Sequence, residues 1–244
     1  MRNIRLTIEY DGKCYNGWQK QPDKLNIQGE IERAIFNITK EEVDLIGSGR
    51  TDGVHALGQI ANFKTNSNMP IEKMAIAINS QLKNSIIIKK AEEVDERFHS
   101  RYNAKQKTYR YVINNSEYGT AIYRNLQYCF PIKLDAEKMK EAAKYFEGEH
   151  DFKAFKSSGT SGKNSVRTIY KAEVRKEGDN IIIELTGNGF LYNMVRIISG
   201  TLLDVGLGKI KPEEIPEIIE SKDRQRAGRT LPAHGLYLVQ VVYN

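Results

Sequence analysis

The spacing of apolar residues along the chain is the strongest constraint on its fold. Residues 4–10 alternate between apolar and polar types, which is typical of a half-buried strand. From Ile27 to Ile38, apolar residues recur at helical spacing along one face. The same two patterns predict two strands, a second helix and a closing strand, at residues 42–46, 59–64, 70–82 and 86–94. The order β-α-β-β-α-β is that of a ferredoxin-like unit.

The rest of the chain repeats this order with insertions. Strand patterns occupy residues 108–113, 169–175, 181–185 and 236–243, and helical patterns occupy residues 135–146, 190–203 and 215–219. We expect residues 149–167 to form a long loop. A basic connector at 98–107 marks the domain boundary, so one half spans residues 1–104 and the other residues 105–244. The sequence therefore predicts an α+β fold of two ferredoxin-like halves, with mostly antiparallel sheets and a central active-site cleft.

Composition limits where the chain works and what it binds. Lys and Arg outnumber Asp and Glu by 37 to 31, and the net charge of +6 mildly favours a polyanion such as nucleic acid. No apolar run approaches the roughly 20 residues of a membrane span, and the N-terminus lacks a signal-peptide pattern. Cys14 and Cys129 are far apart, which argues against a disulfide framework and a structural zinc site. We expect a cytoplasmic protein with no membrane partner.

One loop between predicted strands concentrates polar chemistry. Residues 47–55 hold three glycines together with one arginine, one aspartate and one histidine. Glycine allows the backbone to approach a substrate closely, and loops between strands often carry catalytic residues. Asp52 is therefore a candidate catalytic carboxylate. The local sequence alone favours a plain hairpin turn, in which Asp52-Gly53 is the turn dipeptide.

Arg196 stands out in the second half. It lies in the middle of the predicted helix 190–203, which is apolar on nearly every side. A buried charge needs a partner because desolvating it alone is costly. If the two halves face each other, Asp52 is a candidate partner, and the arginine would keep the aspartate ionised. Such a carboxylate can attack or stabilise an electron-poor sugar carbon. The alternative, which sequence reasoning slightly favours, is a structural ion pair with another acid.

Other chemistry is not indicated by the motifs. Metal-ligand spacing is absent among the four histidines, which are His55, His99, His150 and His234. The sequence has no phosphate loop, dinucleotide fingerprint or nucleophile elbow. Tyr15 and Trp18 lie in a loop beside Lys and Gln, where they either stack on bases or fold back onto the core, and the core is favoured. The basic loop at 156–165 suits either disorder or ordering on RNA.

Many short segments of the chain match one family in order. They are Tyr10-Asp11-Gly12, Gly17-Trp18-Gln19, Gly49-Arg50-Thr51-Asp52, Gly53-Val54-His55-Ala56, Phe98-His99, Tyr109-Arg110-Tyr111, His150-Asp151-Phe152, Gly189-Phe190-Leu191, Met194-Val195-Arg196 and Ala233-His234-Gly235-Leu236. On these segments the chain resembles the tRNA pseudouridine synthase A family along essentially its full length. The resemblance implies that uridine is isomerised to pseudouridine in the anticodon stem-loop of tRNA, at positions 38, 39 or 40.

The resemblance also implies roles for particular residues. The catalytic aspartate falls on Asp52, the tyrosine that stacks on the target base on Tyr109, and the arginine that pairs with the aspartate on Arg196. Arg50 matches the residue that intrudes into the RNA. The remaining substrate-binding candidates are Tyr15, Trp18, His55, Arg101 and Arg110. Neither a metal nor an organic cofactor is implied, and the implied partners are tRNA and a second copy of the chain in a homodimer.

The chain departs from the family pattern at one point. One residue normally separates the aspartate from the Gly-Val-His segment, whereas here Gly53 follows Asp52 directly. The loop is therefore one residue short beside the candidate carboxylate.

Two other functions remain open on the sequence. A non-catalytic RNA-binding protein would bind tRNA in a salt-sensitive way without changing its nucleosides. A hydrolase of the glycosidic bond would release free base, although no general acid or base beside Asp52 is identified.

Overall fold

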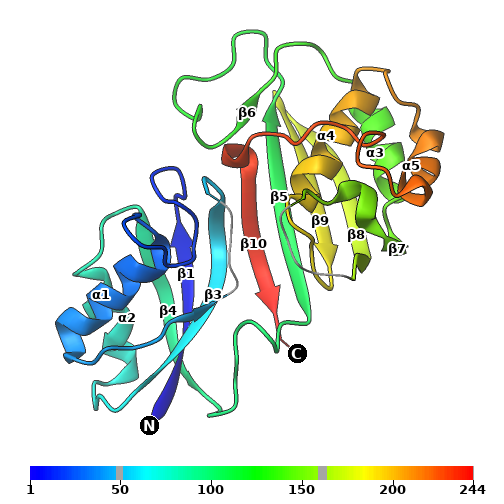
Figure 1. The fold of residues 1–244 in the computed structure, drawn as a ribbon. Helices are drawn as coiled ribbons and strands as arrows, with labels where there is room; N and C mark the ends of the chain where they lie inside the picture. The colour runs from blue at the N-terminus through cyan, green and yellow to red at the C-terminus, as the bar shows by residue number, and fades with distance from the viewer. Residues whose placement is uncertain (48–51, 159–163, 244) are drawn as a thin grey trace. The chain divides into compact units, whose positions relative to one another are not determined.

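The computed structural model describes residues 1–47, 52–158 and 164–243, and it has mixed α/β architecture (Figure 1). The chain divides into two compact units. Unit 1 comprises Met1–Lys105 together with Tyr237–Asn244, and unit 2 comprises Gln106–Leu236. The closing strand, which was predicted to belong to the second half, contributes residues 237–244 to unit 1.

Unit 1 follows the predicted element order. Its elements are β1 (Arg2–Tyr10), α1 (Ile27–Thr39), β2 (Ile46–Gly47), β3 (His55–Thr65), α2 (Ile71–Asn79) and β4 (Ile86–Val94). Strand β1 lies between β4 and β3 and is antiparallel to both. The short strand β2 pairs antiparallel with β3 at Asn62 and Ala61. The last strand, β10 (Leu236–Val242), pairs in parallel with β3 through Tyr237 and Leu238.

Local sequence explains these elements. Asn26 caps α1 by accepting a hydrogen bond from the Gly29 amide, and Lys40 ends the helix with a left-handed φ of 61°. The alternation predicted for β1 places Ile4, Leu6 and Ile8 in the core. Helices α1 and α2 lie together on one face of this sheet (Figure 1).

Unit 2 is built on a four-stranded path with the order β5-β9-β8-β7, in which neighbouring strands are antiparallel. The strands are β5 (Gln106–Asn114), β6 (Tyr128–Cys129), β7 (Gly148–Asp151), β8 (Val166–Glu177) and β9 (Asn180–Gly187). The short strand β6 pairs in parallel with β5. The ladders of the two units therefore include both antiparallel and parallel pairs.

Three α-helices and three short 3₁₀ turns complete unit 2 among the residues that the structure describes. They are α3 (Ala136–Lys144), α4 (Met194–Gly206), α5 (Ile215–Ser221), η1 (Phe152–Phe155), η2 (Pro212–Glu214) and η3 (Ala233–Gly235). Helix α3 packs against β8 and α4, and α4 also contacts β5. The burial predicted for a helix at residues 190–203 is confirmed in α4, where most residues are buried.

The expectation of one long loop at 149–167 was wrong at its start. Residues 148–151 form the edge strand β7, and the 3₁₀ turn η1 follows. Strand β7 is polar and only partly buried, so it lacks the alternation that marks a strand in sequence. Its place is set by pairing with β8 and by the packing of Phe152 and Phe155 in the core.

Candidate functional site

Asp52 lies on an exposed turn in unit 1. Gly53 follows with a φ of +74°, a left-handed conformation that glycine adopts without a steric penalty. The chain then enters β3 at His55, with Val54 already buried. The carboxylate therefore lies three residues before the buried start of β3. Arg50, the predicted RNA-intruding residue, lies outside the described residues.

Tyr15 and Trp18 are both core residues of unit 1. Tyr15 is 4% exposed, and its hydroxyl lies 2.7 Å from that of Ser85. Trp18 is 1% exposed, and its ring centroid lies 6.1 Å from that of Tyr10. This is the alternative that the residues alone favoured for this loop. In this conformation neither ring presents a face to a base.

His55 is also enclosed rather than presented to solvent, with an exposed fraction of 1%. Its Nδ1 accepts a hydrogen bond of 3.1 Å from the Gly12 amide and lies 3.0 Å from a carboxylate oxygen of Asp11. The ring stacks on Tyr237 with centroids 5.0 Å apart. These contacts hold the start of β3 against the end of β1.

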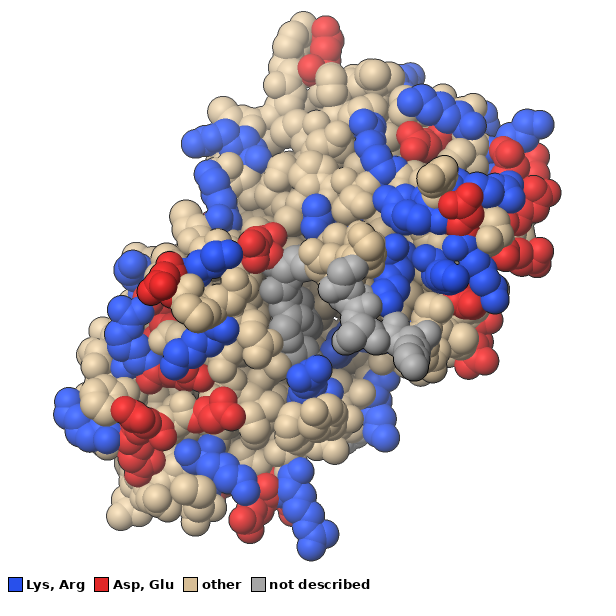
Figure 2. Space-filling model, in the orientation of Figure 1, with Lys and Arg blue, Asp and Glu red and all other residues tan. Residues whose placement is uncertain are grey.

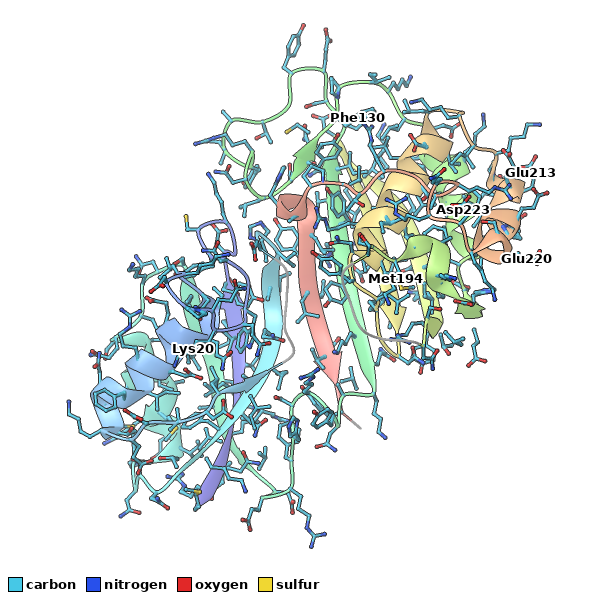
Figure 3. The ribbon with its side chains drawn as sticks, viewed as in Figure 1. Lys20, Phe130, Met194, Glu213, Glu220 and Asp223 are labelled. Carbon is cyan, nitrogen blue, oxygen red and sulfur yellow. The ribbon has the colours of Figure 1, made fainter. Side chains whose placement is uncertain are left out.

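Arg196 has neutral hydrogen-bond acceptors within unit 2. The helix begins at Met194 (Figure 3), so Arg196 lies in its first turn and not in its middle as predicted. The guanidinium Nε donates to the Leu231 carbonyl at 2.6 Å, and a terminal nitrogen donates to Asn193 Oδ1 at 2.8 Å. Among the described residues of unit 2, no carboxylate lies within the 4.0 Å of an ion pair. Burial lowers the pKa of Arg196, although nearby Tyr111 opposes this effect.

Asn193 is a contributor that sequence reasoning missed. Its φ of 60° is left-handed, which asparagine tolerates better than most residues. Its side chain accepts from Arg196 and donates to the Ser157 hydroxyl at 3.0 Å. The available signal was its position immediately before the helix that carries Arg196.

Tyr109 lies on β5 with an exposed fraction of 8%. Its ring meets Phe190 edge-on, with centroids 5.1 Å apart and planes at 79°. Two residues further along β5, the Tyr111 hydroxyl donates to the Pro232 carbonyl at 2.7 Å, next to the carbonyl that Arg196 uses. Burial raises the pKa of Tyr111, so this phenol stays protonated. Unit 2 thus ties the strand of Tyr109 to the helix of Arg196 through residues 231–232.

The other predicted arginines are in different settings. Arg110 forms a half-buried ion pair of 2.9 Å with Glu184 on the neighbouring strand. Arg101 is exposed, with its guanidinium carbon 5.6 Å from the Tyr102 ring centroid. Figure 2 shows Lys and Arg mixed with Asp and Glu on the visible surface of both units. Charge alone therefore does not mark one binding surface on this face.

Across residues 1–47, 52–158 and 164–243, no group of three or more His, Cys, Asp or Glu side chains is arranged to hold a metal ion. No helix within those same ranges is long and apolar enough to span a bilayer.

The structure is a mixed α/β fold that carries an exposed aspartate on a turn, a packed tyrosine and a half-buried arginine. The model of the tRNA pseudouridine synthase family matches residues 6–103 and 142–244. The chain belongs to the tRNA pseudouridine synthase family, and its enzyme class is therefore isomerase.

Full-length relatives agree with this assignment. The chain is 57% identical over 244 residues to tRNA pseudouridine synthase A of Acetivibrio thermocellus, with all of both chains covered. It is 59% identical to tRNA pseudouridine synthase A of Caldicellulosiruptor saccharolyticus, and 54% identical to tRNA pseudouridine synthase A 2 of Clostridium perfringens, again over 100% of both chains.

Proposed function

We propose that this protein isomerises uridine to pseudouridine in the anticodon stem-loop of tRNA, at positions 38, 39 or 40, with Asp52 as the essential carboxylate. The observation that carries the proposal is the identity of 57% along the whole chain with a tRNA pseudouridine synthase A. The exposed turn that holds Asp52 is consistent with it, because an attacking carboxylate must reach substrate.

The reaction exchanges one bond to the ribose for another. The bond from C1′ to N1 breaks, the base turns, and C5 bonds to C1′. C5 then loses its proton and N1 gains one, so the product is an isomer of the substrate. The Asp52 carboxylate attacks or stabilises the electron-poor carbon that forms when the first bond breaks. The target nucleotide must leave its stack before this carbon is reached, which costs a few kcal/mol. Neither a metal nor an organic cofactor takes part in the proposed reaction.

The other site residues support this step. Tyr109 stacks on the target base, and Arg50 intrudes into the RNA and helps to expel the base. Arg196 pairs with the Asp52 carboxylate and keeps it ionised. Two features of Arg196 support an anionic partner. The described residues of unit 2 that accept its hydrogen bonds are neutral oxygens. Arg196 also lies near the N-terminus of α4, where the helix dipole favours anions. The other candidates of the substrate-binding set are Arg101, Arg110, His55, Tyr15 and Trp18. The last three are buried, so they support the set through packing and not through contact with RNA.

The proposed assembly is a cytoplasmic homodimer built from chains with two ferredoxin-like halves. Unit 1 supports the ferredoxin-like part of this proposal, since its element order is β-α-β-β-α-β. Its strands β4, β1 and β3 are neighbours in that order, and both the short β2 and β10 pair with β3. In unit 2 the helix and hairpin order is similar, with β7 as an addition.

The first prediction tests the carboxylate. Asp52→Asn keeps the shape of the side chain and removes its charge, so proton release from C5 of uridine in tRNA should fall at least about a thousandfold. Binding of tRNA should stay within about twofold, because the carboxylate acts on the reacting carbon. Asp23→Asn, on another exposed turn of unit 1, is the matched control and should retain full activity.

The same assay separates the alternatives. A non-catalytic RNA-binding protein would bind tRNA and leave its nucleosides unchanged, and a hydrolase would release free uracil. Wild-type activity in Asp52→Asn would contradict the proposed role of the carboxylate.

A further inference from the structure

We propose that residues 10–18 form a positioning platform for Asp52, with Gly12 and Trp18 as its two contact points. This inference rests on the proposed catalytic role of Asp52. Asp52 lies in unit 1 between the end of β2 at Gly47 and the start of β3 at His55. Both ends of the loop meet residues 10–18, which we call the platform.

The upstream contact is between Gly47 and the indole of Trp18. A Cβ built on Gly47 would lie 2.6 Å from Cζ2 and 2.7 Å from Cε2 of Trp18, closer than real Cβ atoms approach. Only glycine therefore fits at this position of β2, where the strand meets the indole. Trp18 is fully buried, so it cannot move aside into solvent. The point where the chain departs toward Asp52 is fixed against a rigid aromatic surface.

The downstream contact is between Gly12 and the backbone of Val54. A Cβ on Gly12 would lie 2.0 Å from the Val54 carbonyl oxygen, so the two backbones are in direct contact. An unprotonated Nδ1 of His55 accepts from the Gly12 amide at 3.1 Å, and a protonated Nδ1 donates to the Asp11 carboxylate at 3.0 Å. These contacts fix the chain two to three residues after Asp52.

The platform is itself held on both sides. Its Asp11 amide donates to the Ser85 carbonyl at 2.9 Å, and the Tyr15 hydroxyl reaches the Ser85 side chain. At the other end, the Gly17 and Trp18 carbonyls accept hydrogen bonds of 3.3 and 3.0 Å from the first residues of α1. The platform therefore joins α1 and the start of β4 to both ends of the loop.

This arrangement gives the buried aromatic ring a role that does not require contact with RNA. Catalysis by a carboxylate depends on its position, and a displacement of about 1 Å can cost about a hundredfold in rate. Asp52 lies two residues before Val54, so the contact of Val54 with Gly12 acts close to the carboxylate. Trp18 and Gly12 thus act on the reaction through the placement of Asp52.

The test first adds a methyl group at the contact between Gly47 and Trp18, and then makes room for that group with a smaller side chain at position 18. Gly47→Ala should lower kcat about tenfold or more, while the Kd for tRNA stays within about twofold. Trp18→Leu should also lower kcat, because the loop end loses its support. In the double variant Gly47→Ala with Trp18→Leu, the smaller side chain makes room for the new methyl group. The double variant should therefore have a higher kcat than Gly47→Ala alone.

Phe63→Leu is the matched control. Phe63 is a buried aromatic residue of the same unit, on β3 opposite Ile4, and its loss should reduce stability without changing kcat. If Gly47→Ala does not fold, Trp18→Phe carries the test, with a lowered kcat at unchanged Kd as the expected result.

Three outcomes would overturn the inference: wild-type kcat in the folded platform variants, a weakened Kd with unchanged kcat, or no recovery in the double variant. Its failure is distinct from that of the proposed function. If Asp52→Asn is inactive and Gly47→Ala is fully active, only the positioning role of the platform is contradicted. If Asp52→Asn is active, the proposed catalytic role of Asp52 is contradicted.

Discussion

The guanidinium of Arg196 is partly buried and donates two hydrogen bonds of fixed direction. The Leu231 carbonyl accepts from Nε, and Asn193 accepts from a terminal nitrogen on another side of the same planar group. A guanidinium can serve both acceptors at once because its donors diverge in one plane. A lysine ammonium has the charge but not this geometry.

We therefore expect Arg196→Lys to destabilise the protein although the charge is kept. Loss of one directed bond from a charged donor should lower the free energy of unfolding by about 1.5–3 kcal/mol. Arg226→Lys is the control, since Arg226 is exposed and lies 3.5 Å from Glu217, and its effect should stay below about 0.5 kcal/mol. Urea unfolding of both variants measures the difference, and equal stabilities would refute the argument.

At the scale of elements, α4 is pressed against the segment that follows α5. A Cβ on Gly200 would lie 1.8 Å from the Arg229 carbonyl oxygen, and one on Gly228 would lie 2.5 Å from the Thr201 nitrogen. The two backbones touch, and the Gly228 amide donates to the Thr201 hydroxyl at 2.9 Å. The same segment leads to the Leu231 carbonyl that holds Arg196.

We expect Gly200→Ala to destabilise the protein by about 2 kcal/mol or more. Alanine improves helix propensity by about 1 kcal/mol, but the new methyl group meets a backbone oxygen that no side-chain rotation can relieve. The neighbouring variant Ser199→Ala is the control. The Ser199 hydroxyl is buried with no hydrogen-bond partner among the described residues, so its removal should be neutral or stabilising. Thermal unfolding would contradict the packing argument if Gly200→Ala were the more stable of the two.

Local sequence patterns specify some of these elements, whereas others depend on contacts between distant residues. The strand β1 and the helix α1 could be predicted because their apolar periodicity and the Asn26 cap are local signals. The strand β7 could not be predicted, because its polar residues are placed by non-local pairing with β8 and by the core packing of the turn that follows it. For the candidate site, glycine spacing and the family resemblance pointed to Asp52. The burial of Trp18 against Gly47 depends on residues 29 positions apart, and no local pattern specifies that contact.

For the whole molecule, the decisive feature is that unit 1 uses both ends of the chain. Residues 237–244 join Met1–Lys105, so unit 2 is inserted between two parts of unit 1. The returning strand β10 pairs with β3 through Tyr237 and His55, which are 182 positions apart. Closing so long a loop costs conformational entropy before the contact stabilises the fold. Unit 1 should therefore depend on contacts that form only when the chain is complete.

The C-terminal contacts give this dependence a direct test in Tyr243→Ala. The Tyr243 hydroxyl donates to the Ser100 carbonyl at 2.8 Å, and its ring lies 4.9 Å from that of Phe98. Loss of this hydrogen bond and ring contact should lower the free energy of unfolding by about 1–3 kcal/mol. Amide hydrogen exchange should accelerate first in β1 and β3, and later in β8 and β9. Tyr170→Ala, which removes a half-exposed ring from β8, should leave β1 and β3 protected. Earlier exchange of β8 and β9 in Tyr243→Ala would mean that this C-terminal contact does not govern the stability of unit 1.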